Sequence, residues 1–403
     1  MLNKKTIGII CGGAALILLT FLFIRLQNQK VIMDEGFHVR QIQQFAAGNF
    51  TPDKSLAMGP GYHLAAMLPA KVAGGDLRTI RIINLILNLG AVGIFYLIAR
   101  RIDRERAILR TALFLVFPLS LPFILMVYTD IFSTGVILVT FYFILRKKYS
   151  LAGLSGIYSL IVRQNNIIWY AFLFVLGFVR ETEGKRISRD QIIAYLKKTP
   201  VFVLGFAVFA VYVFLNRGIA LGSEARLFAR EGISLNNIYF FMFSNFLFFL
   251  PEHISNMPRV LKLLSKKRKL LWIIIPLLFF FYLTIRNDHI WNQQGYLLRN
   301  RPLIFFTASN INKFIYFLII AYTSISLIFI TFPGKIYYFL YPVLFLTVLP
   351  FNLVEPRYYL VFYTFFLMLK RRTSLYIYFL TFLAWIIFDA WMMMGTINLT
   401  FYP

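Results

Sequence analysis

Two adjacent carboxylates, Asp34 and Glu35, follow the first long apolar run of the chain. Neighbouring carboxylates repel each other, and this repulsion favours proton uptake by one of them. A carboxylate placed at the edge of a hydrophobic segment could act as a general base toward a hydroxyl group. The same pair could instead cap a helix beginning near Phe37, because acidic side chains stabilise a first helical turn. Both interpretations fit the sequence.

Two further titratable residues fall at comparable positions. His38 follows Asp34 by four residues, so the two would share a helix face. It could donate to a phosphate, orient the carboxylate, or be structural. Asp130 ends the segment Tyr128-Thr129-Asp130, which joins two apolar runs with almost no loop. Its carboxylate is therefore expected at the membrane margin, either binding a substrate or capping the helix that follows.

Arginine and amide side chains recur at the ends of other apolar runs. Arg163 is followed by Gln164 and Asn165, and Arg357 follows Glu355 and a proline. Amides bind sugar hydroxyls, and the planar guanidinium group binds phosphate through paired hydrogen bonds. Arg163 could instead extend toward lipid headgroups. Arg357 is a candidate phosphate ligand or a partner for the neighbouring glutamate.

The composition places these residues in a membrane protein. Of 403 residues, 59% are hydrophobic, 18% are aromatic and only 14% are charged, and the mean hydropathy is +0.71. Soluble domains carry about 25% charged residues, so a soluble enzyme is excluded. We predict one all-α polytopic membrane domain over residues 1–403 with roughly 11–14 transmembrane helices, a catalytic half near 1–180 and a substrate-shaping half near 181–403.

The apolar runs predict thirteen spans, and the broken stretch 57–75 is expected at the interface or as a re-entrant segment. The predicted spans are 7–25, 79–99, 111–127, 131–145, 151–162, 167–179, 200–215, 235–254, 271–285, 313–332, 336–351, 358–369 and 375–394.

Charge sets the expected orientation. The formal net charge is +26, and the basic residues concentrate in alternate loops that would be cytoplasmic and close to membrane lipids. Nucleic-acid binding is therefore not expected. The acids and amides lie mostly in the opposite loops. The single cysteine, Cys11, lies within the first apolar run and excludes an intramolecular disulfide.

One face thus offers a carboxylate, guanidinium groups, amides and aromatic residues at the hydrophobic boundary. This set suits a sugar donor whose tail lies in the bilayer and whose phosphate protrudes from it. Arginine would stabilise the phosphate leaving group while a carboxylate activates the acceptor hydroxyl, so a single displacement would invert the anomeric centre. We expect no metal and no cofactor, because arginines can carry the phosphate charge.

Seven short motifs, in order, resemble the dolichyl-phosphate-glucose-dependent alpha-1,2-glucosyltransferases, which add the terminal glucose of the lipid-linked N-glycan precursor. The similarity covers about residues 30–250 and returns near 300–365. The motifs are Met33 to His38, Ala47 to Phe50, Gly59 to Tyr62, Tyr128 to Asp130, Arg163 to Trp169, Gly218 to Gly222, and Glu355 to Tyr358.

The resemblance implies the fold of the C-superfamily membrane glycosyltransferases, with the active site on the luminal or periplasmic face. It gives Asp34 the base role, with Glu35 beside it. It also implies a polyprenyl-phosphate glucose donor, a lipid-linked oligosaccharide acceptor and an alpha-1,2 product. The membrane would be that of the endoplasmic reticulum in a eukaryote and the plasma membrane in a prokaryote.

The sequence departs from the family pattern at two places. Ser223 replaces a family acidic residue, and Glu224 follows it. A His-containing family segment is reduced to Arg301-Pro302 and Ser309-Asn310. Both departures fall where contacts to the substrates are expected, so they bear on the acceptor more than on the reaction.

Two alternatives remain. A related enzyme could move another sugar, or use lipid A, protein or a cell-surface polymer as acceptor, with the same base and arginines. A transporter or flippase of lipid-linked glycans would favour broken or charged helices at the bilayer midplane. Asp389 is the only clear acid in the middle of a predicted span, which makes a transporter the weaker alternative.

Overall fold

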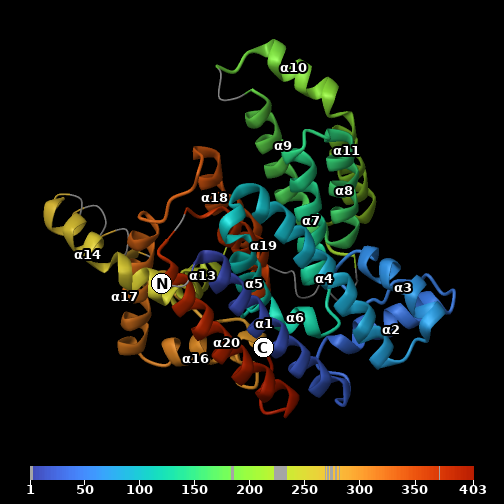
Figure 1. Ribbon diagram of the computed structural model, residues 1–403, viewed down its shortest axis with the longest axis horizontal. Helices are drawn as coiled ribbons and strands as arrows, with labels where there is room; N and C mark the ends of the chain where they lie inside the picture. Colours follow the sequence, from blue (N-terminus) through green and yellow to red (C-terminus); the bar gives the residue numbers. More distant parts are fainter. Residues whose placement is uncertain are drawn as a thin grey trace.

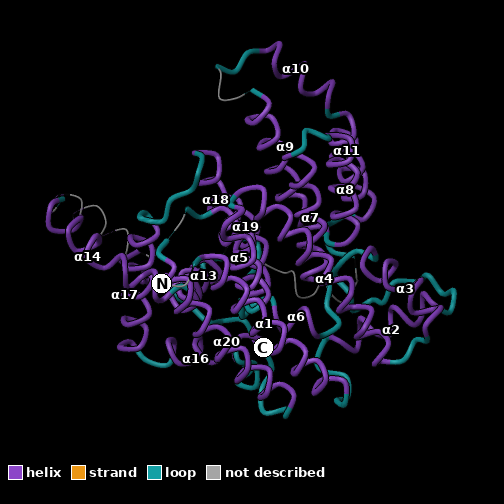
Figure 2. The backbone as a smooth tube through the Cα atoms, viewed as in Figure 1, coloured by secondary structure: helices purple, strands orange, loops and turns teal. Residues whose placement is uncertain are grey.

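The computed structural model describes residues 3–182, 186–221, 234–267, 282–371 and 373–403, together with residues 269, 272, 276, 279 and 280. Within these ranges all regular elements are helices (Figure 2), and the one strand-like pairing is a bridge between Leu297 and Tyr402. The predicted all-α class is confirmed.

The helices run through the whole chain (Figure 1). They are α1 Lys4–Gln27, α2 Glu35–Ala46, α3 Gly61–Ala73, α4 Leu77–Ile102, η1 Arg104–Arg106, α5 Ala107–Leu115, α6 Leu121–Leu125, α7 Asp130–Leu145, α8 Tyr149–Val162, η2 Gln164–Asn166, α9 Ile167–Glu181, α10 Arg189–Lys198, α11 Pro200–Asn216, α13 Asn236–Phe248, α14 Leu250–Lys266, η3 Ile290–Gln293, α16 Asn300–Thr307, α17 Asn310–Leu327, η4 Lys335–Phe339, α18 Leu340–Val348, η5 Pro356–Tyr359, α19 Leu360–Leu369 and α20 Leu375–Ile397.

Several of these helices fit a bilayer. In the described part of the chain, α1, α4, α17 and α20 are long and apolar enough to cross a membrane, and α10 with α11 counts as one further span if the 81° bend between them is allowed. The bend falls next to Pro200, the first residue of α11, where a proline ring is tolerated in a helix. The protein is thus a multi-pass membrane protein, while the larger number of spans expected from the sequence stays a prediction.

Two predicted spans are wrong as single helices. The predicted span 111–127 is divided into α5 and α6 by a turn that contains Pro118. The predicted span 235–254 breaks between α13 and α14, where Pro251 lies in a new first turn. Proline removes a backbone donor and clashes with the preceding turn, so an apolar run containing it need not be one helix. The predicted span 271–285 lies mostly outside the described residues.

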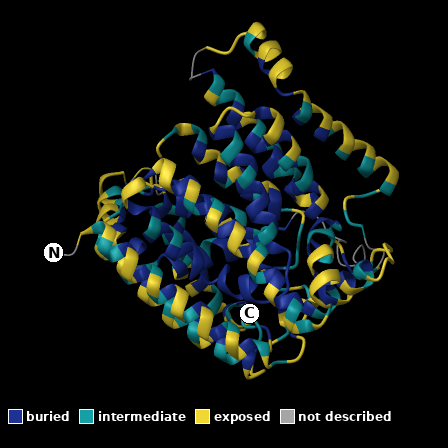
Figure 3. Cartoon of the chain, turned by 45° about the vertical axis from the view of Figure 1, so that its right-hand side comes forward, coloured by how far each residue is buried: buried dark blue, intermediate teal, exposed yellow. Residues whose placement is uncertain are grey.

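The most apolar helices lie inside the molecule. Helices α7 and α19 are strongly apolar and are buried along most of their length. Helices α1 and α20 alternate between buried and exposed residues and pack against each other at the surface (Figure 3). One apolar core joins residues from Cys11 to Ile397.

Helices α2 and α3 form a separate layer that carries the start of the site (Figure 1). They pack on each other, and α3 also packs on α4 and α8. A second apolar cluster joins them through Val39, Ile42, Tyr62 and Ala66. Because α3 is only 13 residues long, the prediction of a non-spanning segment near 57–75 agrees with the structure.

The start of α3 approaches the end of α8 very closely. A Cβ atom added at Gly59 would lie 2.0 Å from the carbonyl oxygen of Ile161, and one at Gly61 would lie 2.9 Å from the amide nitrogen of Val162. Glycine at these positions allows the two backbones to touch. The contact holds the segment that leads into Arg163 against the α2–α3 layer.

Substitution Gly59→Ala should therefore destabilise the protein by about 1–3 kcal/mol, because the neighbour is backbone and cannot rotate away. Gly13→Ala in α1 is the matched control, since a Cβ atom there meets nothing within 4 Å. Thermal unfolding of the detergent-solubilised variants should show a lower midpoint for Gly59→Ala alone. Equal midpoints would contradict the close-contact account.

Candidate active site

Asp34 stands at the entrance to α2 with a partly free carboxylate. Met33 before it adopts the left-handed backbone region at φ 52°, a conformation that costs energy for a residue other than glycine. The Asp34 side chain makes no capping hydrogen bond. It is 47% exposed, and one carboxylate oxygen lies 3.5 Å from the guanidinium group of Arg357. Helix capping therefore does not explain this side chain.

Glu35 is fully buried, and both oxygens of its carboxylate accept hydrogen bonds. Arg81 donates from Nε at 2.9 Å to one carboxylate oxygen and from Nη2 at 2.6 Å to the other. The backbone amides of Ile32 and Val127 donate to the same carboxylate at 3.1 and 3.2 Å. With both oxygens occupied, Glu35 is not free to accept a proton from a substrate, so the geometry does not favour the expected catalytic role.

Arg81, on α4, ties several elements together. Besides its contacts to the carboxylate, it donates to the carbonyl oxygens of Leu26, Gln29 and Lys30 at 2.7–3.0 Å. These carbonyls lie at and just beyond the end of α1, where helical partners run out. Arg81 therefore fixes the connection between α1 and α2, and with it the backbone that presents Asp34.

Asp130 and Arg163 form a second ion pair. Arg163 Nη2 lies 2.9 Å from one Asp130 oxygen, and its Nε donates to the Thr129 hydroxyl at 2.9 Å. The Asp130 carboxylate is 1% exposed, and its other oxygen has no hydrogen-bond partner. An unpaired buried acceptor is costly, so a hydroxyl group that reached this oxygen would satisfy it.

Three amide side chains follow Arg163. Two of them hydrogen-bond to neighbouring elements, and one is exposed. Gln164 donates to the carbonyl oxygen of Ala57 at 3.3 Å. Asn166 donates to the Ser133 hydroxyl at 2.8 Å. Asn165 lies between these two anchors and is exposed. Gln164 and Asn166 thus hold the turn, while the Asn165 amide is left to face a ligand.

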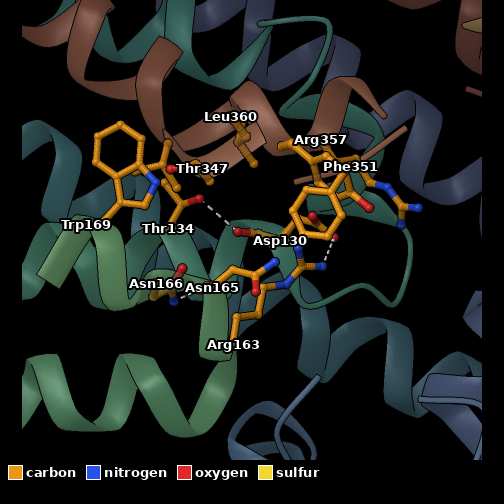
Figure 4. Close-up of a pocket in the computed structure, with 13 residues that line it drawn as sticks. Asp130, Thr134, Arg163, Asn165, Asn166, Trp169, Thr347, Phe351, Arg357 and Leu360 are labelled. Carbon is orange, nitrogen blue, oxygen red and sulfur yellow. Dashed lines mark hydrogen bonds and ion pairs between the residues drawn. The ribbon is translucent and has the colours of Figure 1, made fainter. Parts of the chain in front are cut away.

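These groups line a polar pocket (Figure 4). Its walls include Asp130, Arg163, Asn165 and Arg357, and about 40 Å³ of space between them is free. A mixture of hydroxyl-binding side chains and aromatic faces is typical of a site for a small polar ligand. The aromatic part of the wall comprises Trp169, Phe351 and Tyr358.

Arg357 joins this pocket to Asp34. One guanidinium nitrogen lies 2.9 Å from Glu355 and 3.5 Å from Asp34. The guanidinium carbon lies 5.5 and 5.3 Å from the ring centres of Phe123 and Tyr128. Such cation–π contacts hold a guanidinium group in a fixed position. The carboxylate at the start of α2 and the polar pocket are therefore neighbours.

A second arginine supports the first. Arg299 Nη2 lies 3.0 Å from the Glu355 oxygen that also binds Arg357. Burial would raise the pKa of the Glu355 carboxyl, but the two guanidinium groups outweigh burial and hold its pKa below the ordinary value. Glu355 is therefore an anion that orients two cations.

A large apolar pocket opens on the other side of Arg357. Its volume is about 430 Å³. Arg299, Arg301, Glu355 and Arg357 lie along its polar border, and the rest of the wall is almost entirely apolar. Arg357 lines both pockets. Apolar wall residues include Leu119, Phe123, Phe240, Phe243, Leu247, Phe248, Phe305, Phe306, Phe388 and Trp391.

His38 is buried against a second histidine instead of reaching into either pocket. Its Nδ1 lies 3.0 Å from Nε2 of His63, with the rings stacked. Burial, then the neighbouring His63 and arginines, lower the pKa of His38, and burial lowers that of His63 to about 3. Both rings are therefore neutral, and His38 packs beside Tyr128. Phosphate binding by His38, expected from the sequence, is not supported by this geometry.

The predicted site residues thus fall into two groups. One group converges at the polar pocket or beside it, within reach of a common ligand, and the other holds the surrounding backbone. The first group is Asp34, Asp130, Arg163, Asn165 and Arg357. The second group is Glu35, His38 and Gln164.

Sequence reasoning missed Arg81, Arg299 and His63 as members of this region. Arg81 and Arg299 are single basic residues without a motif. Arg81 falls within a predicted span, where an unpaired charge is costly, and this cost could have identified it. Arg299 lies in a loop between predicted spans, where the sequence gives no such signal.

The predicted loop Asn216 to Glu231, with Ser223 and Glu224, lies mainly outside the described residues. Among the residues the structure does describe, no three His, Cys, Asp or Glu side chains form a group suited to a metal ion.

Residues 28–192 match the DIE2/ALG10 family. The chain is similar to enzymes named Dol-P-Glc:Glc(2)Man(9)GlcNAc(2)-PP-Dol alpha-1,2-glucosyltransferase. The Debaryomyces hansenii enzyme is 25% identical over 54% of this chain and 52% of its own length. The Candida glabrata enzyme is 29% identical over 52% of this chain and 44% of its own length. The resemblance predicted from the motifs is confirmed, and the chain spans about half the length of these curated relatives.

Among solved structures, the chain is similar to ArnT from Cupriavidus metallidurans. The apo form gives a TM-score of 0.43 at 17% identity, covering 83% of this chain and 62% of ArnT. The form bound to undecaprenyl phosphate gives 0.42 at 16% identity, covering 79% and 59%.

The two adjacent acids should respond differently to neutralisation. Glu35→Gln removes the charge that balances buried Arg81, and breaking a buried pair costs about 3–5 kcal/mol. Asp34→Asn should leave stability nearly unchanged, because its carboxylate is half exposed and Arg357 keeps Glu355 as a partner. Thermal unfolding in detergent measures both. Equal losses in the two variants would contradict this division of roles.

Proposed function

We propose that the chain is an inverting glycosyltransferase that moves glucose from a polyprenyl-phosphate donor to a lipid-linked oligosaccharide, forming an alpha-1,2 linkage. The observation that carries the proposal is the position of Arg357, in contact with Asp34 and on the walls of both pockets. The family match at residues 28–192 and the names of the relatives support the sugar, the donor and the linkage.

The donor phosphate would bind at Arg357, with Arg299 beside it. The isoprenoid tail would occupy the apolar pocket, whose wall is rich in phenylalanine. The sugar would enter the polar pocket, where the unpaired oxygen of Asp130 and the amide of Asn165 can bind its hydroxyls. Arg163, held by the Asp130 carboxylate, would add positive charge at the same pocket.

Asp34 would act as the general base. Donor phosphate competes with Asp34 for Arg357, so donor binding would release the carboxylate toward the acceptor. Asp34 would take the proton of the acceptor hydroxyl as its oxygen forms a bond to the anomeric carbon. The bond from that carbon to the phosphate oxygen breaks, and polyprenyl phosphate leaves with its charge stabilised by Arg357. Glu35 would position Asp34 without taking part in proton transfer.

The proposal places Asp34 and both pockets on the luminal or periplasmic side, in keeping with the distribution of basic loops. The N-terminal part supplies Asp34, Asp130 and Arg163. The later part supplies Arg299, Arg357 and most of the apolar pocket. This division supports the expected catalytic and substrate-shaping halves.

A related enzyme for another sugar would use the same base and arginines. Purified protein should be assayed with polyprenyl-phosphate glucose, mannose and arabinose donors and a lipid-linked oligosaccharide acceptor. The proposal expects transfer from the glucose donor with inversion. Transfer from the mannose donor alone would reject glucose as the natural sugar. Transport of a lipid-linked glycan across vesicles without any transfer would favour the transporter alternative.

Removing the proposed base should slow the chemical step. Asp34→Asn should lower kcat by about 100-fold or more, in the range that a general base contributes. Asp190→Asn, at an exposed acid on α10, is the matched control and should retain full activity. Steady-state kinetics with the glucose donor measure both variants, and full activity of Asp34→Asn would remove the base assignment.

Neutralising Arg357 should weaken donor use more than acceptor use. In Arg357→Gln, Glu355 keeps Arg299 as its partner, so the variant should fold. Loss of a charge-assisted contact to phosphate should raise the donor KM about tenfold or more and leave the acceptor KM within about twofold. Lys54→Gln, at an exposed base outside both pockets, serves as the control. Equal changes in the two KM values would contradict a phosphate role.

A further inference from the structure

Helix α14 has an inward face that fixes it to the protein. Glu252 is buried in an ion pair with Lys370. The His253 ring is buried and hydrogen-bonded to the Ser326 hydroxyl at 2.9 Å. Asn256 and Val260 are buried one and two turns further along the same helix. The helix is therefore anchored along one face and can present its other faces to the surroundings.

A second face of α14 is apolar and exposed. Ile254, Met257 and Leu261 are 57%, 47% and 61% exposed. Their spacing of three and four residues places them in one stripe along the helix. A stripe of large apolar side chains on a membrane protein is suited to contact with acyl chains.

A third face is basic. Arg259, Lys262 and Lys266 are exposed, and their spacing of three and four residues again defines one row. None of the three belongs to an ion pair within the described ranges of the chain. The one acid of the helix, Glu252, is already paired on the inward face. This row therefore offers positive charge to a ligand.

The position of α14 agrees with an interfacial role. It lies at the left edge of Figure 1, whereas α2 and α3, which adjoin Asp34, lie at the right. Helix α10, at the top of the same figure and turned by 81° from α11, repeats the pattern with exposed Ile192, Ile193 and Leu196 and a basic last turn. Such helices lie in the headgroup layer with the apolar face in the acyl region.

We propose that α14 lies in the headgroup layer and binds acidic phospholipid through Arg259, Lys262 and Lys266, with its apolar stripe against the acyl chains. This site is separate from Asp34 and from both pockets. The occupant is a membrane lipid and not a free phosphate, because a soluble anion would leave the apolar stripe without a partner. Each basic residue adds attraction to an acidic surface, and salt screens it.

The experiment is native mass spectrometry of the purified chain released from micelles containing equal amounts of phosphatidylglycerol and phosphatidylcholine. The wild type should retain phosphatidylglycerol preferentially. The variant Arg259→Gln, Lys262→Gln, Lys266→Gln should lose that preference by about tenfold. A matched control variant should retain the preference, because its three substituted basic residues are exposed away from α14. Unfolding midpoints check that both triple variants fold. The control is the triple variant Lys54→Gln, Lys71→Gln, Arg78→Gln.

A second arm separates the lipid from a free anion. Soluble glycerol phosphate in large excess should leave lipid retention unchanged, and Met257→Gln, Leu261→Gln should reduce it. The proposal is overturned if the wild type shows no preference, if both triple variants lose it equally, or if glycerol phosphate displaces the lipid fully. None of these outcomes depends on sugar transfer, so failure here is distinct from failure of the proposed function.

Discussion

The buried ion pair between Glu35 and Arg81 sets the geometry on which the site depends. Removing two charges from water is expensive, and the cost is offset only when the remaining hydrogen-bonding positions are used. Arg81 meets this condition through three carbonyls beyond its carboxylate contacts, and Glu35 through two backbone amides. The pair thereby joins the end of α1, the start of α2, α4 and the chain before Tyr128. Asp34 and Asp130 both adjoin backbone that it holds.

Arg357 connects Asp34 with the polar and the apolar pocket. Glu355 and two aromatic rings orient its guanidinium group, and Asp34 lies on its open side. Three acids pair with three arginines there, so a phosphate that binds Arg357 would compete with a carboxylate for its guanidinium group. Asp34 is the most exposed of the three acids, so it is the carboxylate most readily released. The balanced set is Asp34, Asp130 and Glu355 with Arg163, Arg299 and Arg357.

The sequence is sufficient to predict the class of protein, the motifs and the polar residues at their ends. Apolar runs predict helices, and a polar residue at the end of a run signals use or pairing, which is why Asp34 and Arg163 stand out. Ion pairs between residues far apart in the sequence cannot be predicted from these patterns. Arg81 lies 46 residues from Glu35, and only the tertiary fold brings them together. The helix break near Pro251 likewise depends on whether neighbouring helices can hydrogen-bond the backbone groups that the break leaves unpaired.

The central claim is that Arg357 exchanges Asp34 for the donor phosphate. An experimental structure of the protein with a non-transferable polyprenyl-phosphonate glucose tests it most directly. The account predicts phosphonate oxygens within hydrogen-bond distance of Arg357, the tail among the phenylalanines of the apolar pocket, and the Asp34 carboxylate released toward the anomeric carbon. A phosphonate bound away from Arg357, with the contact between Asp34 and Arg357 intact, would contradict it.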